Sequence, residues 1–185
     1  MAFSDQAAVE RRHNTWSPSK LFMWQGCAAQ AKFKHLDKLP DPPGPALARG
    51  SAMHKSAELF INGEADTLPA EVEPSKAYLL PFREAFKKGL AFAELELAFK
   101  NDWKLCGWFD PYVWVRFKLD ALLITDGGLL KVVDFKSGKL KAEEDSQYQK
   151  QLELYVLALL EAAEQSPEWL KGVGVEQVTS ELWFF

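Results

Sequence analysis

An acid and a base, Asp134 and Lys136, end a short apolar segment that begins at Leu129, directly after Gly127 and Gly128. The β-branched residues of this segment predict a buried strand entered through a turn. Side chains alternate across a strand, so Asp134 and Lys136 should project from the same face. An Asp-x-Lys pair at a strand end indicates phosphodiester chemistry, with metal-binding and charge-stabilising groups side by side.

A second acid, Asp120, is placed opposite Asp134 by one register of the expected hairpin. If residues 126–128 form the loop, Thr125 pairs with Leu129 and Asp120 faces Asp134, with Cβ atoms roughly 5 Å apart. At an effective dielectric constant near 20, the two charges would repel by roughly 3 kcal/mol, which a divalent cation between them would remove. A two-residue turn would send the acids to opposite faces instead.

Other candidate residues lie on expected helices and on another strand. His54 and Glu58 are one turn apart on one helix, where the histidine is either an ordinary surface residue or a ligand. Tyr148, Gln151 and Tyr155 form one stripe of a later helix, and the tyrosines either rim the core or face the site. Strand 93–99 would carry its two glutamates on the polar face, and of these Glu96 is the candidate.

The remaining pattern predicts helices first, strands in the middle, and a helix and a strand last. Residues 1–16 are expected to form a flexible arm. The predicted helices span 17–33, 46–61, 76–88 despite Pro81, and 145–165; the predicted strands span 93–99, 108–124, from Leu129 to Lys136, and 173–185.

The composition is that of a globular protein, and we expect a single domain over residues 1–185. No apolar run is long enough to cross a membrane, and the polar first residues do not resemble a secretion signal, so we expect a cytoplasmic protein with no membrane partner. The net charge of −4 is uneven, since residues 1–55 carry +4 and residues 142–185 carry −7. A basic surface can therefore coexist with an acidic region.

Five motifs in order resemble those of the PD-(D/E)XK nucleases, in particular the RecB-like group with CRISPR-associated and phage exonucleases. The match spans nearly the whole chain, and its most specific part is Asp134-Phe-Lys136-Ser-Gly138-Lys139. The other four motifs are Ser17-Pro-Ser19-Lys-Leu21, Gly50-Ser-Ala-Met-His54-Lys-Ser-Ala-Glu58, Asp120, and Gln151-Leu-Glu-Leu-Tyr155.

The resemblance implies an α/β fold with a restriction-endonuclease-like core, a central mixed β-sheet flanked by α-helices. It implies a site for Mg²⁺ or Mn²⁺ made by His54, Asp120, Asp134 and the Phe135 carbonyl, with Glu96 as an outer ligand. Lys136 would orient the attacking water and stabilise the phosphate. Gln151 and Tyr155 would position the lysine or the DNA backbone. The residues implied to contact DNA are Ser19, Lys20, Ser137, Lys139 and Tyr148.

Two departures from the family pattern bear on the site. Gly107-Trp-Phe-Asp110 offers the Gly-x-x-Asp that often carries the first acid, which makes Asp110 a rival to Asp120; we favour Asp120 because it lies in the hairpin opposite Asp134. Some CRISPR-associated relatives hold an iron–sulfur cluster on four cysteines. This chain has two, Cys27 and Cys106, so we expect no cluster.

The expected activity is metal-dependent hydrolysis of DNA from its ends, on single- or double-stranded substrates, in phage or prokaryotic recombination or DNA processing. A recombination protein or a single-strand-binding protein would be a fitting partner. Two alternatives stay open: a nonspecific or structure-specific endonuclease, and a non-catalytic DNA-binding module on the same fold. The sequence does not determine polarity, strand preference or oligomeric state.

Overall fold

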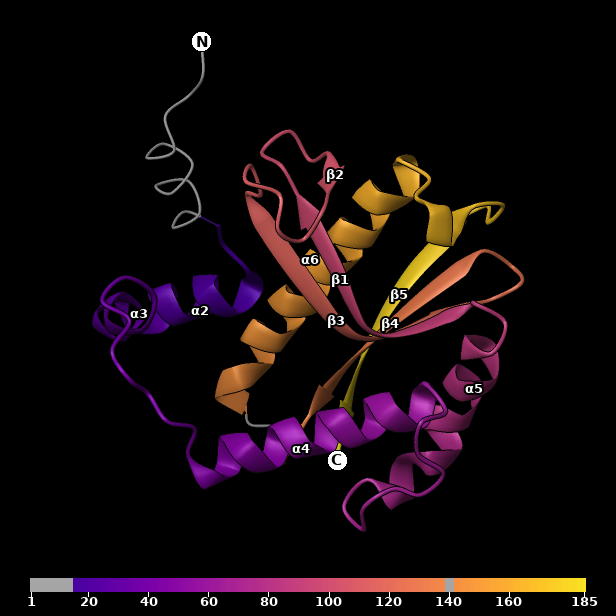
Figure 1. The fold of residues 1–185 in the computed structure, drawn as a ribbon, viewed down its shortest axis with the longest axis horizontal. Coiled ribbons are helices and arrows are strands. Elements are labelled where there is room, and N and C mark those ends of the chain that lie inside the picture. The colour runs from indigo at the N-terminus through magenta and orange to yellow at the C-terminus, as the bar shows by residue number, and fades with distance from the viewer. Residues whose placement is uncertain (1–14, 139–141) are drawn as a thin grey trace. The chain divides into compact units, whose positions relative to one another are not determined.

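The computed structural model describes residues 15–138 and 142–185, and five strands and five α-helices are assigned within them (Figure 1). The strands are β1 (Ala91–Phe99), β2 (Leu105–Cys106), β3 (Val115–Ile124), β4 (Leu129–Lys136) and β5 (Gln177–Phe184). The helices are α2 (Pro18–Gly26), α3 (Ala28–His35), α4 (Pro45–Ile61), α5 (Lys76–Phe86) and α6 (Ala142–Glu164), with short 3₁₀ turns at Glu73–Ser75 and Glu168–Leu170.

The strands form one mixed sheet in the order β2-β1-β3-β4-β5. β1 and β2 are antiparallel, as are β3 and β4, whereas β5 lies parallel to β4 from Leu129–Gln177 to Lys136–Phe184. A parallel neighbour needs a crossover connection, and α6 provides it between β4 and β5. The expected α/β class with a mixed sheet and flanking helices is confirmed.

The chain divides into two compact units, each built from two stretches. Of the described residues, unit 1 comprises 15–42 and 96–117, and unit 2 comprises 43–95, 118–138 and 142–185. Strands β1 and β3 each have residues in both units.

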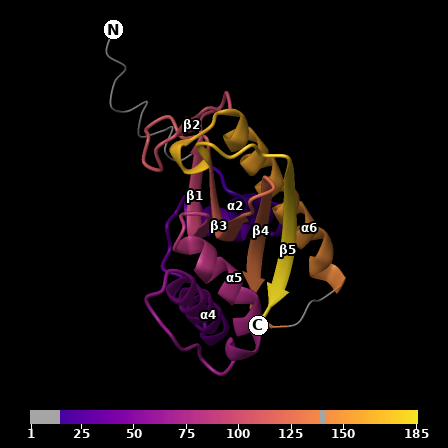
Figure 2. The ribbon, with the colours of Figure 1, turned by 90° about the vertical axis from the view of Figure 1, so that its right-hand side faces the viewer.

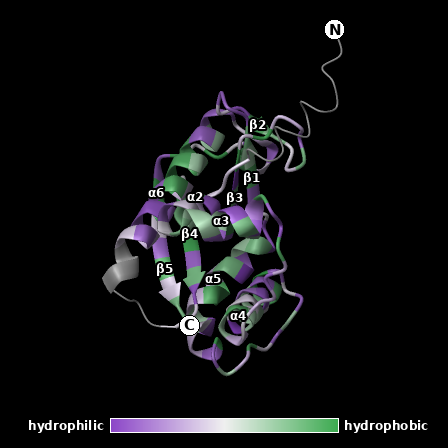
Figure 3. Cartoon of the chain, turned by 90° about the vertical axis from the view of Figure 1, so that its left-hand side faces the viewer, coloured by the Kyte–Doolittle hydropathy of each residue, from purple (hydrophilic) through white to green (hydrophobic). Residues whose placement is uncertain are grey.

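The core of unit 2 lies between the sheet and helices α4 and α5. Val133 and Phe135 of β4 and Ala121 of β3 point to this side, where they meet buried residues of both helices: Met53, Ala57, Phe60, Ile61, Leu79 and Phe82. Helix α6 lies along β4 and β5 on the other side (Figure 2), and it buries one stripe, Tyr155, Ala158, Leu159 and Ala162. Hydrophilic and hydrophobic residues alternate along α6 (Figure 3), as expected for a helix with one face in the core.

Unit 1 is held by aromatic rings. Trp16, Phe99, Trp103, Trp114 and Phe117 contact one another with centroids 5.4–6.0 Å apart. Trp16 also forms a parallel bridge to Val115, and Thr15 is buried with its hydroxyl donating to the Val113 carbonyl at 3.0 Å. These last two residues of the expected arm are therefore part of the fold, while residues 1–14 lie outside the described part.

Three predicted boundaries are wrong. The helix expected over 17–33 breaks at Cys27, whose backbone is extended (φ −152°, ψ 101°), so that α2 and α3 are separate. The strand expected over 108–124 begins at Val115, because Asp110 and the proline after it form a turn in which the Asp110 side chain accepts from the Tyr112 N–H at 2.7 Å. The last strand begins at Gln177 rather than Val173.

Candidate active site

The end of β4 presents its acid and its base to each other. Lys136 Nζ lies 2.6 Å from Asp134 Oδ2, so the two side chains share a face of the strand. Asp134 is 2% exposed, and the Lys136 ammonium lies 4.9 Å from the centroid of the Tyr148 ring. A carboxylate buried this deeply requires charged or hydrogen-bonding partners.

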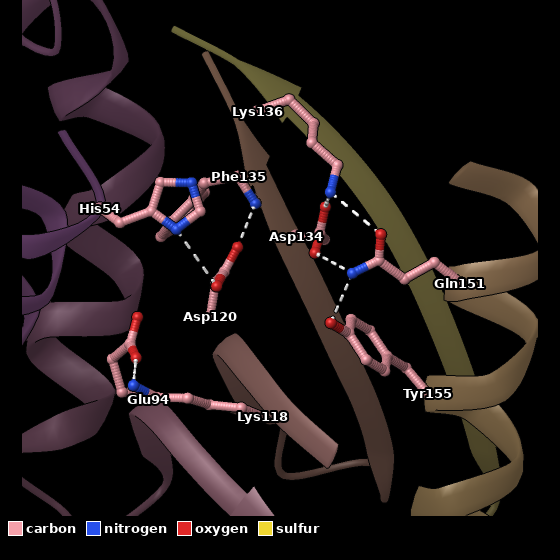
Figure 4. Close-up of polar contacts among 9 residues, drawn as sticks. All are labelled: His54, Glu94, Lys118, Asp120, Asp134, Phe135, Lys136, Gln151 and Tyr155. Atoms are coloured by element: carbon pink, nitrogen blue, oxygen red, sulfur yellow. Dashed lines mark hydrogen bonds and ion pairs between the residues drawn. The ribbon is translucent and has the colours of Figure 1, made fainter. Parts of the chain in front are cut away.

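Helix α6 supplies those partners through Gln151 (Figure 4). Its Nε2 donates to Asp134 Oδ1 at 3.1 Å and to the Tyr155 hydroxyl at 2.6 Å, while its Oε1 accepts from Lys136 Nζ at 3.0 Å. Gln151 and Tyr155 are one helical turn apart and so project from the same side of α6. One amide therefore fixes the acid and the base of β4 together.

The turn between β3 and β4 has three loop residues, as the expected register requires. The Thr125 N–H donates to the Leu129 carbonyl at 3.0 Å, and the paired residues run from Ile124–Leu130 to Ala121–Val133. Gly128 has a φ of +74°, a conformation that glycine adopts without strain. The register is thus the one that places Asp120 beside Asp134, and the two-residue turn is excluded.

Asp120 connects the hairpin to helix α4. Its Oδ2 accepts a hydrogen bond of 2.6 Å from the Phe135 N–H, and its Oδ1 lies 3.3 Å from His54 Nδ1 (Figure 4). The His54 ring also meets the Phe135 ring edge-on at 5.8 Å. Asp120 is therefore held between the backbone of β4 and the imidazole of α4.

Glu94 joins His54 and Asp120 from strand β1. One ligand atom from each of these three residues lies within 4.8 Å of the others. Glu94 has a left-handed backbone (φ +55°), which interrupts the side-chain alternation of β1, and its carboxylate pairs with Lys118 of β3. All three lie in unit 2 and line one cavity of about 570 Å³ together with Lys136.

The site shifts the protonation of three of its groups. Burial and the charge of Asp120 raise the pKa of Asp134 to about 6, although Lys136 and His54 oppose this. Burial alone would lower the pKa of His54, but its hydrogen bond to Asp120 and the nearby carboxylates raise it. Burial and Asp134 raise the pKa of Tyr155, so its hydroxyl stays protonated.

The residues present fit a hard divalent cation. Carboxylate oxygens and an imidazole nitrogen converge in the group His54–Glu94–Asp120, a donor set suited to Mg²⁺ or Mn²⁺. The carboxylates of Asp120, Asp134 and Glu94 raise the pKa of His54, so the cluster favours an added positive charge. A bound cation would supply the missing positive charge, polarise the phosphate and acidify a water molecule.

The model of the PD-(D/E)XK nuclease superfamily matches the chain over residues 15–108 and 76–185. The chain belongs to the PD-(D/E)XK nuclease superfamily. No curated protein matches it. A nuclease of this superfamily depends on a divalent metal and acts on nucleic acid, so the acid, base and histidine cluster of unit 2 is its candidate active site. Within residues 15–138 and 142–185, no helix combines the length and apolarity needed to cross a membrane.

Some of the remaining residues predicted for this nuclease site line the cavity, and others lie in unit 1. Ser137 and Tyr148 line the cavity, as does Phe135, whose carbonyl was expected to bind metal. Lys139 lies outside the described residues. Ser19, Lys20 and Glu96 belong to unit 1. There Ser19 contacts the Ser17 hydroxyl at 3.1 Å, Lys20 donates to the Thr15 carbonyl at 2.8 Å, and Glu96 is exposed.

Asp110, the rival first acid, also lies in unit 1, where it pairs with Lys100 at 3.3 Å and caps a turn. Sequence reasoning missed Glu94 and Lys118. Both glutamates of β1 appear equivalent in an alternating pattern, and nothing in the pattern predicts the left-handed backbone at Glu94. A charged pair on neighbouring strands, Glu94 and Lys118, was the signal available.

Proposed function

We propose that the chain is a metal-dependent deoxyribonuclease that degrades DNA from its ends. The observation that carries the proposal is the hydrogen-bonded series Lys136–Gln151–Asp134 beside the group His54–Glu94–Asp120, all within unit 2. The preference for ends rests on the resemblance of the β4 motif to the RecB-like exonucleases. Recombination or DNA processing in a phage or a prokaryote is the setting that this resemblance favours.

Each residue of the site has a proposed role. His54, Glu94, Asp120 and Asp134 would hold Mg²⁺ or Mn²⁺, with the Phe135 carbonyl as a further ligand. Lys136 would place its ammonium on the scissile phosphate and orient the attacking water. Two partners, Gln151 and Asp134, already fix that ammonium. Gln151 and Tyr155 would act through Lys136 and Asp134 as positioning residues.

The aromatic and hydroxyl groups on the cavity wall are proposed to hold the DNA strand. Tyr148 presents its ring beside Lys136, and Ser137 follows directly after the lysine. A ring next to an ammonium can stack on a base while the ammonium contacts the adjacent phosphate. Lys118 is one further cation on the same wall, and its charge is balanced by Glu94.

The test is degradation of end-labelled linear DNA, single- and double-stranded, with covalently closed circles beside it. Wild type and Lys136→Ala are compared in Mg²⁺, Mn²⁺ and EDTA. We expect metal-dependent loss of linear DNA alone, and at least a 100-fold slower reaction for Lys136→Ala because the phosphate loses its charge partner. Cutting of circles would replace the exonuclease with an endonuclease. Binding of DNA without turnover in any metal would contradict the proposal and favour a non-catalytic module.

A further inference from the structure

The segment of unit 1 between β1 and β3, residues 100–114, exposes an unusual number of rings. We call it the aromatic loop. Phe109 is 83% exposed and Tyr112 is 51% exposed, and Phe109 is the most exposed large hydrophobic side chain in the described part of the chain. Exposed apolar rings in one loop are unfavourable in water and mark surfaces that bind something.

A cation lies against these rings. The guanidinium carbon of Arg116 is 5.2 Å from the centroid of the Trp108 ring and 6.0 Å from that of the Phe109 ring. Its Nε is buried and has no hydrogen-bond partner among the described residues. The acids of the loop do not balance it, because Asp102 pairs with Lys104 at 2.8 Å and Asp110 pairs with Lys100 at 3.3 Å.

Two further basic residues of unit 1, Lys20 and His35, have lowered pKa values. Burial and the charge of Arg116 lower the pKa of Lys20, and burial with the charges of Lys20 and Lys34 lowers the pKa of His35. His35 Nε2 is also buried without a hydrogen-bond partner within residues 15–138 and 142–185. The like charges of Arg116 and Lys20 therefore lie near each other, and such a pair is complementary to an anion.

We propose that Trp108, Phe109, Arg116 and Lys20 form a binding surface for single-stranded DNA that shares no residue with the candidate active site. The exposed Phe109 ring and the half-buried Trp108 ring next to a guanidinium suit unpaired bases and their phosphates, because bases stack on rings and phosphates lie at cations. Duplex DNA would gain only the phosphate contacts because its bases are already stacked on one another. The choice of DNA as the ligand rests on the proposed function, whereas the surface itself uses no residue of the candidate site.

The experiment measures binding of a fluorescently labelled oligothymidine to the full chain in EDTA, where no cleavage interferes. Phe109→Ala should weaken binding about 5- to 100-fold, the loss expected for one stacked base. Binding of a blunt duplex should change less than twofold. Lys20→Gln should reduce the slope of log Kd against log salt by about 0.7, the value for one phosphate contact on a single strand.

Tyr78→Ala is the matched control, because Tyr78 is another exposed ring, 66% accessible, in unit 2. It should bind the oligothymidine like wild type. Equal affinity of Phe109→Ala and wild type would overturn the proposal and leave the rings to a protein partner. If wild type binds the oligothymidine but cleaves no DNA in any metal, the proposed function fails and the single-strand surface stands. Failure of the surface and failure of the proposed function are therefore distinguishable.

Discussion

Asp134 is kept in a setting that disfavours its charge. A pKa raised from 3.8 to about 6 corresponds to roughly 3 kcal/mol of disfavoured ionisation in the folded, metal-free protein. Ionisation is disfavoured because the carboxylate is buried and faces Asp120. The ionised carboxylate therefore does not stabilise the metal-free fold. Replacing one of its oxygens by nitrogen, as in Asp134→Asn, tests this.

The first prediction is that Asp134→Asn stabilises the metal-free protein. The folded pKa lies above the unfolded value, so the ionised carboxylate destabilises the fold fully above pH 6, and the effect fades as the pH falls toward 3.8. Thermal unfolding in EDTA should show a gain on the order of 1–3 kcal/mol at pH 8 and a smaller one at pH 5. Asp126→Asn, which replaces an exposed loop acid, should leave the stability unchanged at both pH values. A loss of stability at pH 8 would show that the Lys136 ion pair dominates.

The second prediction concerns Gln151, which holds both Asp134 and Lys136. Gln151→Ala should slow single-turnover DNA cleavage on the order of 10- to 100-fold, because an ammonium placed loosely stabilises the phosphate poorly. Its affinity for Mn²⁺, measured by calorimetry, should stay within about threefold of wild type. Gln165→Ala, at the far end of α6, should cleave normally. Unchanged cleavage by the Gln151 variant would mean that Lys136 needs no amide partner.

At the scale of elements, the β3–β4 hairpin decides which residues meet. Its three-residue loop sets the pairing that brings Asp120 to Asp134. The segment just before β5 constrains the loop itself. A Cβ on Gly128 would lie 2.0 Å from the Gly174 carbonyl oxygen, which is backbone and has little freedom to move. The glycine is therefore required both by its φ of +74° and by the close approach of residues 174–176.

The third prediction follows from that contact. Gly128→Ala should destabilise the protein by roughly 2–4 kcal/mol, because left-handed strain adds to a backbone clash. Gly127→Ala is the matched control, since its Cβ would meet no atom within 4 Å. Chemical denaturation should give a lower free energy of unfolding for Gly128→Ala than for Gly127→Ala. If both are as stable as wild type, the loop does not adopt this geometry.

This hairpin was predictable because turn residues and strand alternation act over a few neighbouring positions. Helix α4 was predicted to one residue for the same reason, and with it His54. The break at Cys27 and the left-handed Glu94 were not predictable, because cysteine is no helix-stop signal and a residue other than glycine rarely adopts a left-handed backbone. Glu94 consequently entered the site only when the strands were placed in three dimensions.

At the scale of the whole molecule, residues 15–42 and 96–117 form one unit although 53 positions separate the two stretches. Patterns of hydropathy predict the elements of such a unit but not that they associate, because association depends on long-range packing. The motifs predicted the PD-(D/E)XK superfamily, which is confirmed, whereas the RecB-like group stays a prediction. They also predicted Asp120, Asp134, Lys136 and Gln151 as site residues, which the structure brings together in unit 2. The division into units had no sequence signal.

The measurement that tests the central claim most directly is the Mn²⁺ dependence of DNA cleavage by Glu94→Gln and Glu96→Gln. These glutamates are two positions apart on β1, but only Glu94 lies with His54 and Asp120. We expect Glu94→Gln to need about 10-fold more Mn²⁺ or above for half-maximal cleavage, and Glu96→Gln to match wild type. Equal metal dependence of all three proteins, or cleavage that persists in EDTA, would contradict a metal-dependent nuclease site at His54–Glu94–Asp120.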